Sequence, residues 1–143
     1  MIISKLDAAQ IQLDSAIDHF FQGDHVCAVT LAGAAEDIFA GLLNEEDLES
    51  AFQFLYNWYQ KTYNKTVSKS YFSQQILNLV RNWLKHSDAD THTQIDITER
   101  DSIMMLMRAL PCYFKLANSH TEKMKRFYKY VKDNQKEIDK LFS

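Results

Sequence analysis

The segment from Val26 to Leu43 constrains the fold most, because it is apolar on almost every side when it is drawn as a helix. A helix of this kind has to be buried on nearly all its faces, so we expect it at the centre of the protein. Four small residues in a row would let neighbouring helices approach closely: Ala32, Gly33, Ala34 and Ala35. Glycine inside a helix costs about 0.5–1 kcal/mol relative to alanine, which predicts a packing reason for Gly33 and Gly41.

The rest of the chain also carries helical patterns. Only three glycines and one proline occur in 143 residues, too few for a turn-rich β-sandwich or barrel. Periodicity predicts helices over 4–22, 25–43, 44–63, 70–85, 96–118 and 123–140. The 46% apolar content suits one domain with a hydrophobic core. We therefore predict a single all-α domain over residues 1–143, an up-and-down bundle of five or six helices.

Polar residues at the predicted helix ends indicate where the helices stop and start. Gly23 marks the end of the first helix, and Asp24 and Ser70 are expected to cap the second and fourth. Asn44, followed by acids, is expected to begin the third. Capping-box spacing at Asp96–Glu99 and at Ser119–Glu122 predicts the starts of the last two.

Nothing in the sequence indicates export. The first residues lack the apolar core of a signal peptide, and no run of about 18 apolar residues is expected to span a bilayer. Cys27 and Cys112 lie inside helical patterns without a CxxC pairing, so we expect two buried thiols in a reducing compartment. These features predict a cytoplasmic protein without a membrane partner.

Charge is divided unevenly along the chain. Residues 1–60 hold ten acids and one lysine, a net charge of −9, whereas residues 61–143 hold nine acids and fifteen bases, a net charge of +6. This division allows an electropositive surface of the kind that binds nucleic acid. Alternatively, the two halves attract each other within the bundle, and the lysine-rich last helix is a solvated outer face.

The third predicted helix is unusually aromatic. It carries six rings: Phe52, Phe54, Tyr56, Trp58, Tyr59 and Tyr63. Six rings spread over one helix cannot all face the same core, so we expect some of them to form an exposed patch. Core packing explains the others, and the exposed ones suit self-association or, less readily, base stacking.

Two neighbouring acids interrupt the central apolar helix. Glu36 points the same way as Val29, Ala32 and Leu43, and a carboxylate in such a stripe has to be paired, protonated or open to a cleft. Asp37, the next residue, lies on the neighbouring face, which is the only polar edge of this predicted helix. Glu36 is therefore either a strut to a neighbouring helix or a support for a functional arginine. Arg108 lies on a narrow strip of the fifth predicted helix that we expect to face solvent.

The hexapeptide Arg81-Asn82-Trp83-Leu84-Lys85-His86 is the candidate site. Arginine and asparagine donate hydrogen bonds to phosphate oxygens, and histidine exchanges protons near neutral pH. This set suits RNA cleavage by a 2′-hydroxyl, which needs no metal. In an ideal helix Arg81 points about 140° away from His86, so convergence requires the helix to end near Lys85 or a second copy of the chain. Otherwise Lys85 and His86 are merely cations at a helix C-terminus.

In an all-helical domain of this size, the RNxxxH hexapeptide resembles the HEPN superfamily, the higher eukaryote and prokaryote nucleotide-binding domains. The segment from Thr30 to Ile38 is also similar to the second helix of some bacterial members. The resemblance implies a symmetric homodimer that acts as a metal-independent endoribonuclease in toxin–antitoxin, defence or RNA-processing systems. It implies that Arg81 holds the scissile phosphate, that Asn82 is the usual polar residue after it, that His86 is the acid–base group, and that Glu36 orients the arginine.

Several alternatives remain open at the level of sequence. Asp88 stands where some toxin members carry a tyrosine that a partner nucleotidyltransferase modifies, and Asp88 and Asp90 would repel a phosphate backbone. His86, Asp88, Asp90 and His92 do not match a calcium loop, so no metal and no cofactor is predicted. The main rival to the ribonuclease is a non-catalytic helical module that binds a nucleotide or a protein, with Arg81 and His86 in structural roles.

Overall fold

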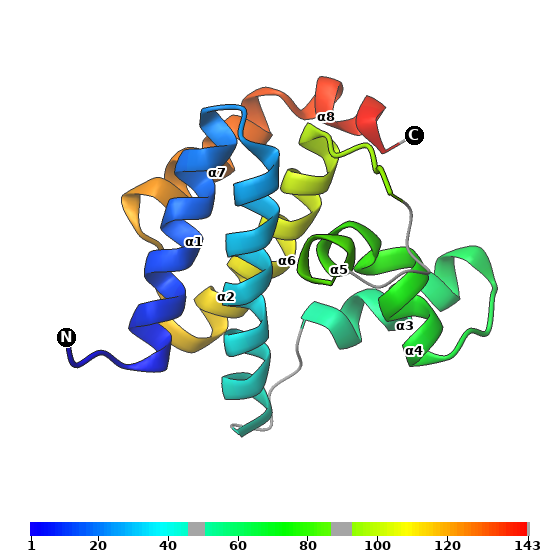
Figure 1. The fold of residues 1–143 in the computed structure, drawn as a ribbon, viewed down its shortest axis with the longest axis horizontal. Helices are drawn as coiled ribbons and strands as arrows, with labels where there is room; N and C mark the ends of the chain where they lie inside the picture. Colours follow the sequence, from blue (N-terminus) through cyan, green and yellow to red (C-terminus); the bar gives the residue numbers. More distant parts are fainter. Residues whose placement is uncertain (46–50, 87–92, 143) are drawn as a thin grey trace.

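The computed structural model describes residues 1–45, 51–86 and 93–142, and every regular element in these ranges is helical (Figure 1). The prediction of an all-α protein is confirmed over this part of the chain. In chain order the elements are α1 (Lys5–Phe21), α2 (His25–Glu45), α3 (Ala51–Tyr63), α4 (Lys69–Tyr71), the π-helical segment η1 (Phe72–Leu77), α5 (Leu79–Lys85), α6 (Glu99–Ala117), α7 (Glu122–Asp133) and α8 (Gln135–Leu141).

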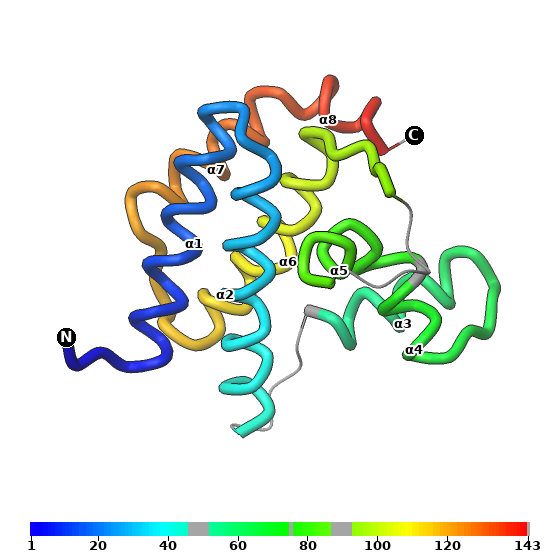
Figure 2. Tube along the Cα trace, viewed as in Figure 1, coloured from blue at the N-terminus to red at the C-terminus, as the bar shows by residue number. Residues whose placement is uncertain are grey.

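Helix α2 lies at the centre, as its apolar sequence predicts. It runs antiparallel to α1 and packs against α1 on one side and α6 on another, while α7 packs against α1 (Figures 1 and 2). Large side chains from these four helices fill the core, among them Leu13, Ile17, Phe39, Leu43, Leu106, Leu110, Met124 and Phe127. The burial of this apolar surface is the main stabilising contribution to the fold.

The elements from α3 to α5 lie on the side of α2 away from α1 (Figure 1). Phe72, only 2% exposed, is the centre of a small aromatic cluster there. Rings of Phe52, Tyr56 and Tyr59 lie 5.8, 5.5 and 5.2 Å from it, measured between centroids. The other rings of α3 face solvent, namely Phe54, Trp58 and Tyr63. The expectation that six rings divide between a packed and an exposed set is confirmed.

Two of the predicted helices are interrupted, so the count of five or six is not what the described residues show. The predicted fourth helix consists of α4, η1 and α5, because the N–H of Asn78 donates to Ser73 O at 2.8 Å and closes a five-residue turn. The predicted last helix breaks at Asn134, which separates α7 from α8.

Some predicted helix ends are correct and others are displaced by two residues. Gly23 has a φ of +78°, and Oδ1 of Asp24 accepts from the N–H of Cys27 at 3.1 Å, as expected of a stop and a cap. The fourth and last predicted helices begin after Ser68 and Thr121, whose hydroxyls accept from Tyr71 N and Met124 N. The capping box before α6 joins Thr98 to Asp101 rather than Asp96 to Glu99.

The end of α2 also differs from the prediction. Asn44 and Glu45 continue this helix and do not begin the next one. The acids at positions 46 and 47, part of the same expectation, lie outside the described residues.

The expectation that no segment could span a bilayer was wrong by length and composition. Helix α2 has 21 residues, and the mean hydropathy of its best window is 1.7, sufficient for a spanning helix even though Glu36 and Asp37 lie within it. A buried core helix of a soluble protein passes the same test, and nearly half of that window is buried by the surrounding helices.

The two cysteines differ in their surroundings. Cys112 is buried, as predicted, but Cys27 is only half-buried because it lies in the first turn of α2, next to the α1–α2 turn. Neither cysteine takes part in a disulfide within the described part of the chain.

Candidate functional site

Helix α5 ends at Lys85, which is one of the two conditions under which Arg81 and His86 could converge. His86 has an extended backbone, with φ −124° and ψ 145°, and its N–H donates to Asn82 O at 3.1 Å. The side chain of His86 is exposed. The direction of the imidazole is therefore no longer tied to the helical repeat that places Arg81 and His86 on different sides of an ideal helix.

Arg81 turns inward, toward α2. It is 8% exposed, and its Nη2 donates to Oδ2 of Asp37 while its Nη1 lies 3.9 Å from Oε2 of Glu36. Its aliphatic part crosses α2 at Gly33, where an added Cβ would lie 2.8 Å from Nε and 3.0 Å from Cδ. The predicted packing reason for Gly33 is thus confirmed. Gly41 has nothing within 4 Å of such a Cβ, so the same prediction was wrong there.

Glu36 is paired mainly with an arginine from another helix. Nη2 of Arg108 donates to Oε1 of Glu36 at 2.9 Å and lies 2.8 Å from Oε2. Both residues are almost fully buried, with 3% exposure for Glu36 and 2% for Arg108. Burial lowers the pKa of Arg108, and the charge of Glu36 opposes that shift. Glu36 is therefore a strut between α2 and α6 as well as a neighbour of Arg81.

Asn78 completes the surroundings of Arg108. Nη1 of Arg108 donates to Oδ1 of Asn78 at 2.8 Å, and the amide of Asn78 donates to the hydroxyl of Ser73 at 2.9 Å. Asn78 stands at the end of η1, so the π-helical turn is what points this amide at α6. The buried arginine thus joins three elements: α2, α6 and the segment leading into α5.

Five charged side chains form one network, which we call the charge cluster: Glu36, Asp37, Arg81, Lys85 and Arg108. Nζ of Lys85 lies 3.4 Å from Oδ2 of Asp37, so Asp37 faces two cations at the outer edge of the cluster. With three cations and two carboxylates, the cluster carries one net positive charge. The Nε atoms of Arg81 and Arg108 are buried without a hydrogen-bond acceptor in the described ranges.

The structure brings together four of the six predicted site residues and leaves two apart. Arg81, Lys85, Glu36 and Asp37 belong to the charge cluster. Within the described part of the chain, no hydrogen bond joins the side chain of Asn82 or His86 to it. One protomer thus provides an inward arginine and an outward histidine, little more than one helical turn apart in sequence.

Sequence reasoning missed two residues of the network. Arg108 was assigned to a wet strip of its helix, but it is 2% exposed. Its apolar neighbours at helical spacing, Met105 and Cys112, are the signal that could have indicated burial. Asn78 carries no such signal, because its role depends on the π-helical turn.

Positions 88, 90 and 92, which the alternative metal site needs, lie outside the described residues. A separate group that brings three ligand types together occurs at the α1–α2 turn, where His19, Asp24 and Cys27 meet. A shallow polar hollow at the end of α3 contains none of the charge cluster and is lined by Asn57, Gln60, Lys61, Asn64, Lys65 and Thr66.

Comparison with known proteins does not assign the chain to a family. No protein-family model, no curated protein and no solved structure matches it.

Proposed function

We propose that this protein is a metal-independent endoribonuclease of the HEPN type, which cleaves RNA by attack of a 2′-hydroxyl on the adjacent phosphate. The observation that carries the proposal is the end of α5 at Lys85. It releases an exposed His86 from the helix shortly after the buried, oriented Arg81.

The reaction needs only groups that this hexapeptide contains. A base removes the proton of the 2′-hydroxyl, the 2′-oxygen bonds to phosphorus, and the bond from phosphorus to the 5′-oxygen breaks. The leaving 5′-oxygen takes up a proton, and a 2′,3′-cyclic phosphate remains. His86 supplies the proton transfer, and Arg81 stabilises the charge that develops on the phosphate oxygens. Asn82 adds a neutral donor one residue further on.

Arg81 is held in place by acids, and this supports a role in phosphate binding. Packing over Gly33 restricts its stem, and Asp37 engages its outer edge. Asp37 is 55% exposed, so an RNA phosphate can reach the same edge and compete with the carboxylate. Lys85 then faces the incoming phosphate together with Arg81. Preorganisation of this kind reduces the cost of ordering a long side chain on binding.

We propose that the protein acts as a homodimer. The histidine and the arginine of one protomer are not joined, and a second copy places two RNxxxH segments at a shared cleft. The exposed rings of Phe54 and Trp58, four residues apart on α3, offer an apolar surface for such a contact. Light scattering at micromolar concentration should give the mass of two chains for the wild type and of one chain for Trp58→Ser. A wild-type monomer would count against the dimer.

The test of activity is cleavage of mixed RNA in the presence of EDTA. We expect the wild type to leave 2′,3′-cyclic phosphate ends and His86→Ala to lose cleavage by at least a hundredfold, as is typical for removal of a general acid–base group. His120→Ala is the matched control. His120 is a half-buried histidine outside the hexapeptide, stacked on Phe114 at 4.8 Å, and its loss should leave cleavage unchanged. Cleavage that survives His86→Ala would show that His86 is not the catalytic group.

The rival function is a non-catalytic helical module that binds a nucleotide or a protein, such as an antitoxin or a nucleotidyltransferase. One observation favours it: Arg81 is 8% exposed and already paired with Asp37. In that case clean wild-type protein cuts no RNA in the same assay, and the exposed face of α3 becomes the first candidate for the binding surface. A cytoplasmic location is proposed for either function.

A further inference from the structure

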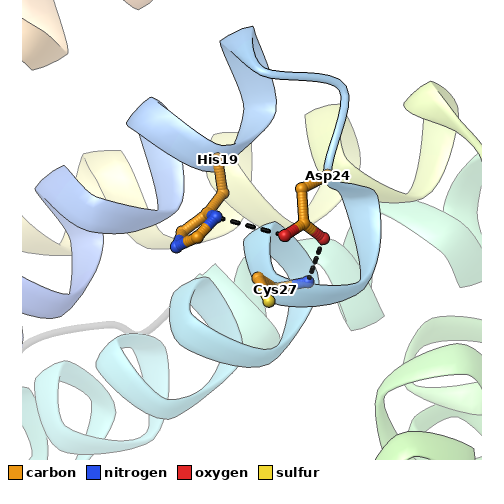
Figure 3. A group of neighbouring side chains, drawn as sticks. All are labelled: His19, Asp24 and Cys27. Carbon is orange, nitrogen blue, oxygen red and sulfur yellow. Dashed lines mark hydrogen bonds and ion pairs between the residues drawn. The ribbon is translucent and has the colours of Figure 1, made fainter.

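The turn between α1 and α2 gathers three side chains of different chemistry. His19 comes from the last turn of α1, Asp24 immediately precedes α2, and Cys27 lies in the first turn of α2 (Figure 3). Their ligand-type atoms, one from each side chain, all lie within 4.8 Å of one another. All three residues are half-buried, so the group is accessible from solvent while its backbone is held by two helices.

The tight turn at Gly23 is what brings the two helix ends together. Gly23 adopts a φ of +78°, and the N–H of Asp24 donates to His19 O at 2.9 Å, so the chain reverses within a few residues. Oδ1 of Asp24 then accepts from the N–H of Cys27 at 3.1 Å, while Oδ2 faces Nδ1 of His19 at 3.2 Å. The backbone thus fixes where the imidazole, the carboxylate and the thiol point.

We propose that His19, Asp24 and Cys27 bind a zinc ion through one nitrogen, one oxygen and one sulfur, with water as the fourth ligand. Nitrogen, oxygen and sulfur from these three residue types are the ligands that Zn²⁺ takes in proteins. Zinc–ligand distances of about 2.0 Å at tetrahedral angles separate a nitrogen from an oxygen by about 3.3 Å. The 3.2 Å between Nδ1 of His19 and Oδ2 of Asp24 fits that separation.

The sulfur needs only a small movement to join them. Zinc–sulfur distances of about 2.3 Å place a thiolate about 3.5 Å from the other two ligands. Since the sulfur of Cys27 lies within 4.8 Å of both, it has to approach them by about 1.3 Å at most. The contact between Nδ1 of His19 and Oδ2 of Asp24 at 3.2 Å is not a hydrogen bond of good geometry within the described ranges, so zinc between these two atoms would not displace a strong hydrogen bond.

The same three residues do not suit a cysteine–histidine nucleophile. In Figure 3 the ring nitrogen of His19 that does not face Asp24 points away from Cys27, so the imidazole is not placed between the carboxylate and the thiol. Hydrogen bonding to Asp24 and partial burial raise the pKa of the Cys27 thiol, the opposite of what activates a nucleophile. Zinc would displace that thiol proton on binding, as it does at other thiolate sites.

The zinc site is separate from the charge cluster. Cys27 and Glu36 are nine residues apart on α2, which corresponds to about 14 Å along the helix axis. The inference does not depend on the proposed ribonuclease, whose assay contains EDTA, and either proposal can fail without the other.

The test uses tag-free, metal-stripped full-length protein titrated with Co²⁺, a spectroscopic substitute for Zn²⁺, and then with Zn²⁺ in competition. We expect one ion per chain at micromolar concentration, with a near-ultraviolet band from charge transfer between the thiolate and Co²⁺, which one equivalent of Zn²⁺ abolishes. Cys27→Ser should remove the band. Cys112→Ser, which changes the buried cysteine, should leave it unchanged.

Asp24→Asn removes the carboxylate ligand but keeps the helix cap, because asparagine can still accept from the N–H of Cys27. We expect this variant and His19→Gln each to weaken Co²⁺ binding at least tenfold while circular dichroism stays that of the wild type. Absence of a bound ion, a bound ion without the sulfur band, or binding unaffected by His19→Gln would each overturn the site.

Discussion

Gly33 and Arg81 are in contact so closely that no methyl group fits between them: a Cβ on Gly33 would lie 2.8 Å from Nε of Arg81, 3.0 Å from its Cδ and 3.3 Å from its Cγ. These atoms belong to the middle of a buried side chain whose far end is held by Asp37. The arginine cannot move aside without giving up that pairing. The position of Arg81 therefore depends on the absence of a side chain on the central helix.

Gly33→Ala should lower the free energy of unfolding, although alanine favours a helix. The overpacking costs about 1–3 kcal/mol against a propensity gain of about 0.5–1 kcal/mol, so the net effect is a loss of stability. Gly41→Ala is the matched control in the same helix, since nothing lies within 4 Å of its added Cβ. It should stabilise the protein by about 0.5–1 kcal/mol. Urea unfolding measures the free energy of unfolding of both variants. If Gly33→Ala were more stable than the wild type, the close contact between Gly33 and Arg81 would be wrong.

Glu36→Ala should be one of the most damaging single changes. It leaves Arg108 buried without its carboxylate, and breaking a buried ion pair in this way costs about 3–5 kcal/mol. Glu122→Ala removes an exposed acid that pairs with Lys125 and should cost less than about 1 kcal/mol. Chemical denaturation compares the two. A cost below about 1 kcal/mol for Glu36→Ala would mean that Glu36 does not hold Arg108.

Asp37→Asn should strengthen RNA binding, because the amide oxygen can still accept from Arg81 while the negative charge that competes with phosphate for Arg81 and Lys85 is removed. Removal of one negative charge next to the phosphate is worth about 1 kcal/mol at the protein surface, or about fivefold in affinity. The gain should shrink as salt is added. Asp133→Asn, which changes an acid paired with Lys129 on α7, controls for net charge. Filter binding measures the affinity of the wild type and of both variants for one RNA. An equal gain in affinity for Asp37→Asn and Asp133→Asn would rule out a specific role for Asp37.

Tyr130→Phe should change how stability depends on pH at the alkaline end. The hydroxyl of Tyr130 donates to Oε1 of Glu99 at 2.6 Å, and this bond, with burial, raises the pKa of Tyr130 to about 12. A pKa raised above the ordinary value of 10.0 contributes stability that is fully present below pH 10 and is lost as pH rises toward 12.

Urea unfolding across that pH range should therefore show that the free energy of unfolding falls more steeply with pH for the wild type than for Tyr130→Phe. At neutral pH the variant should be less stable by about 1 kcal/mol, the usual net value of such a bond. Tyr63→Phe changes an exposed tyrosine and should behave as the wild type. Parallel curves for wild type and Tyr130→Phe would contradict the assigned hydrogen bond.

Periodicity predicted where most helices lie, because the spacing of apolar side chains reports directly which face of a helix is buried. It also placed Glu36 on a buried face and therefore predicted that it needs a partner. Periodicity could not identify Arg108 as the partner of Glu36, because a helical repeat within one segment carries no information about which residue of another segment lies opposite. That choice depends on how α2 and α6 cross.

The displaced caps have a local reason. Asp96–Glu99 and Thr98–Asp101 overlap and have the same spacing, so both satisfy the capping-box pattern. The structure uses the second, and α6 begins at Glu99. Composition likewise gave no sign of η1, since its residues are ordinary helix formers and only the hydrogen bond from Asn78 to Ser73 reveals the wider turn.

The π-helical turn sets the rotational phase of every residue after it. One residue more or fewer within Phe72–Leu77 would rotate α5 by about 100° relative to the bundle. Arg81 would then leave Gly33, and Asn78 would leave Arg108. Substitutions that keep the length of this segment need only local adjustment of side chains. An insertion or deletion changes the direction in which the side chains of the whole RNxxxH hexapeptide point. The length of η1, more than the identity of its residues, is what variants of this protein have to preserve.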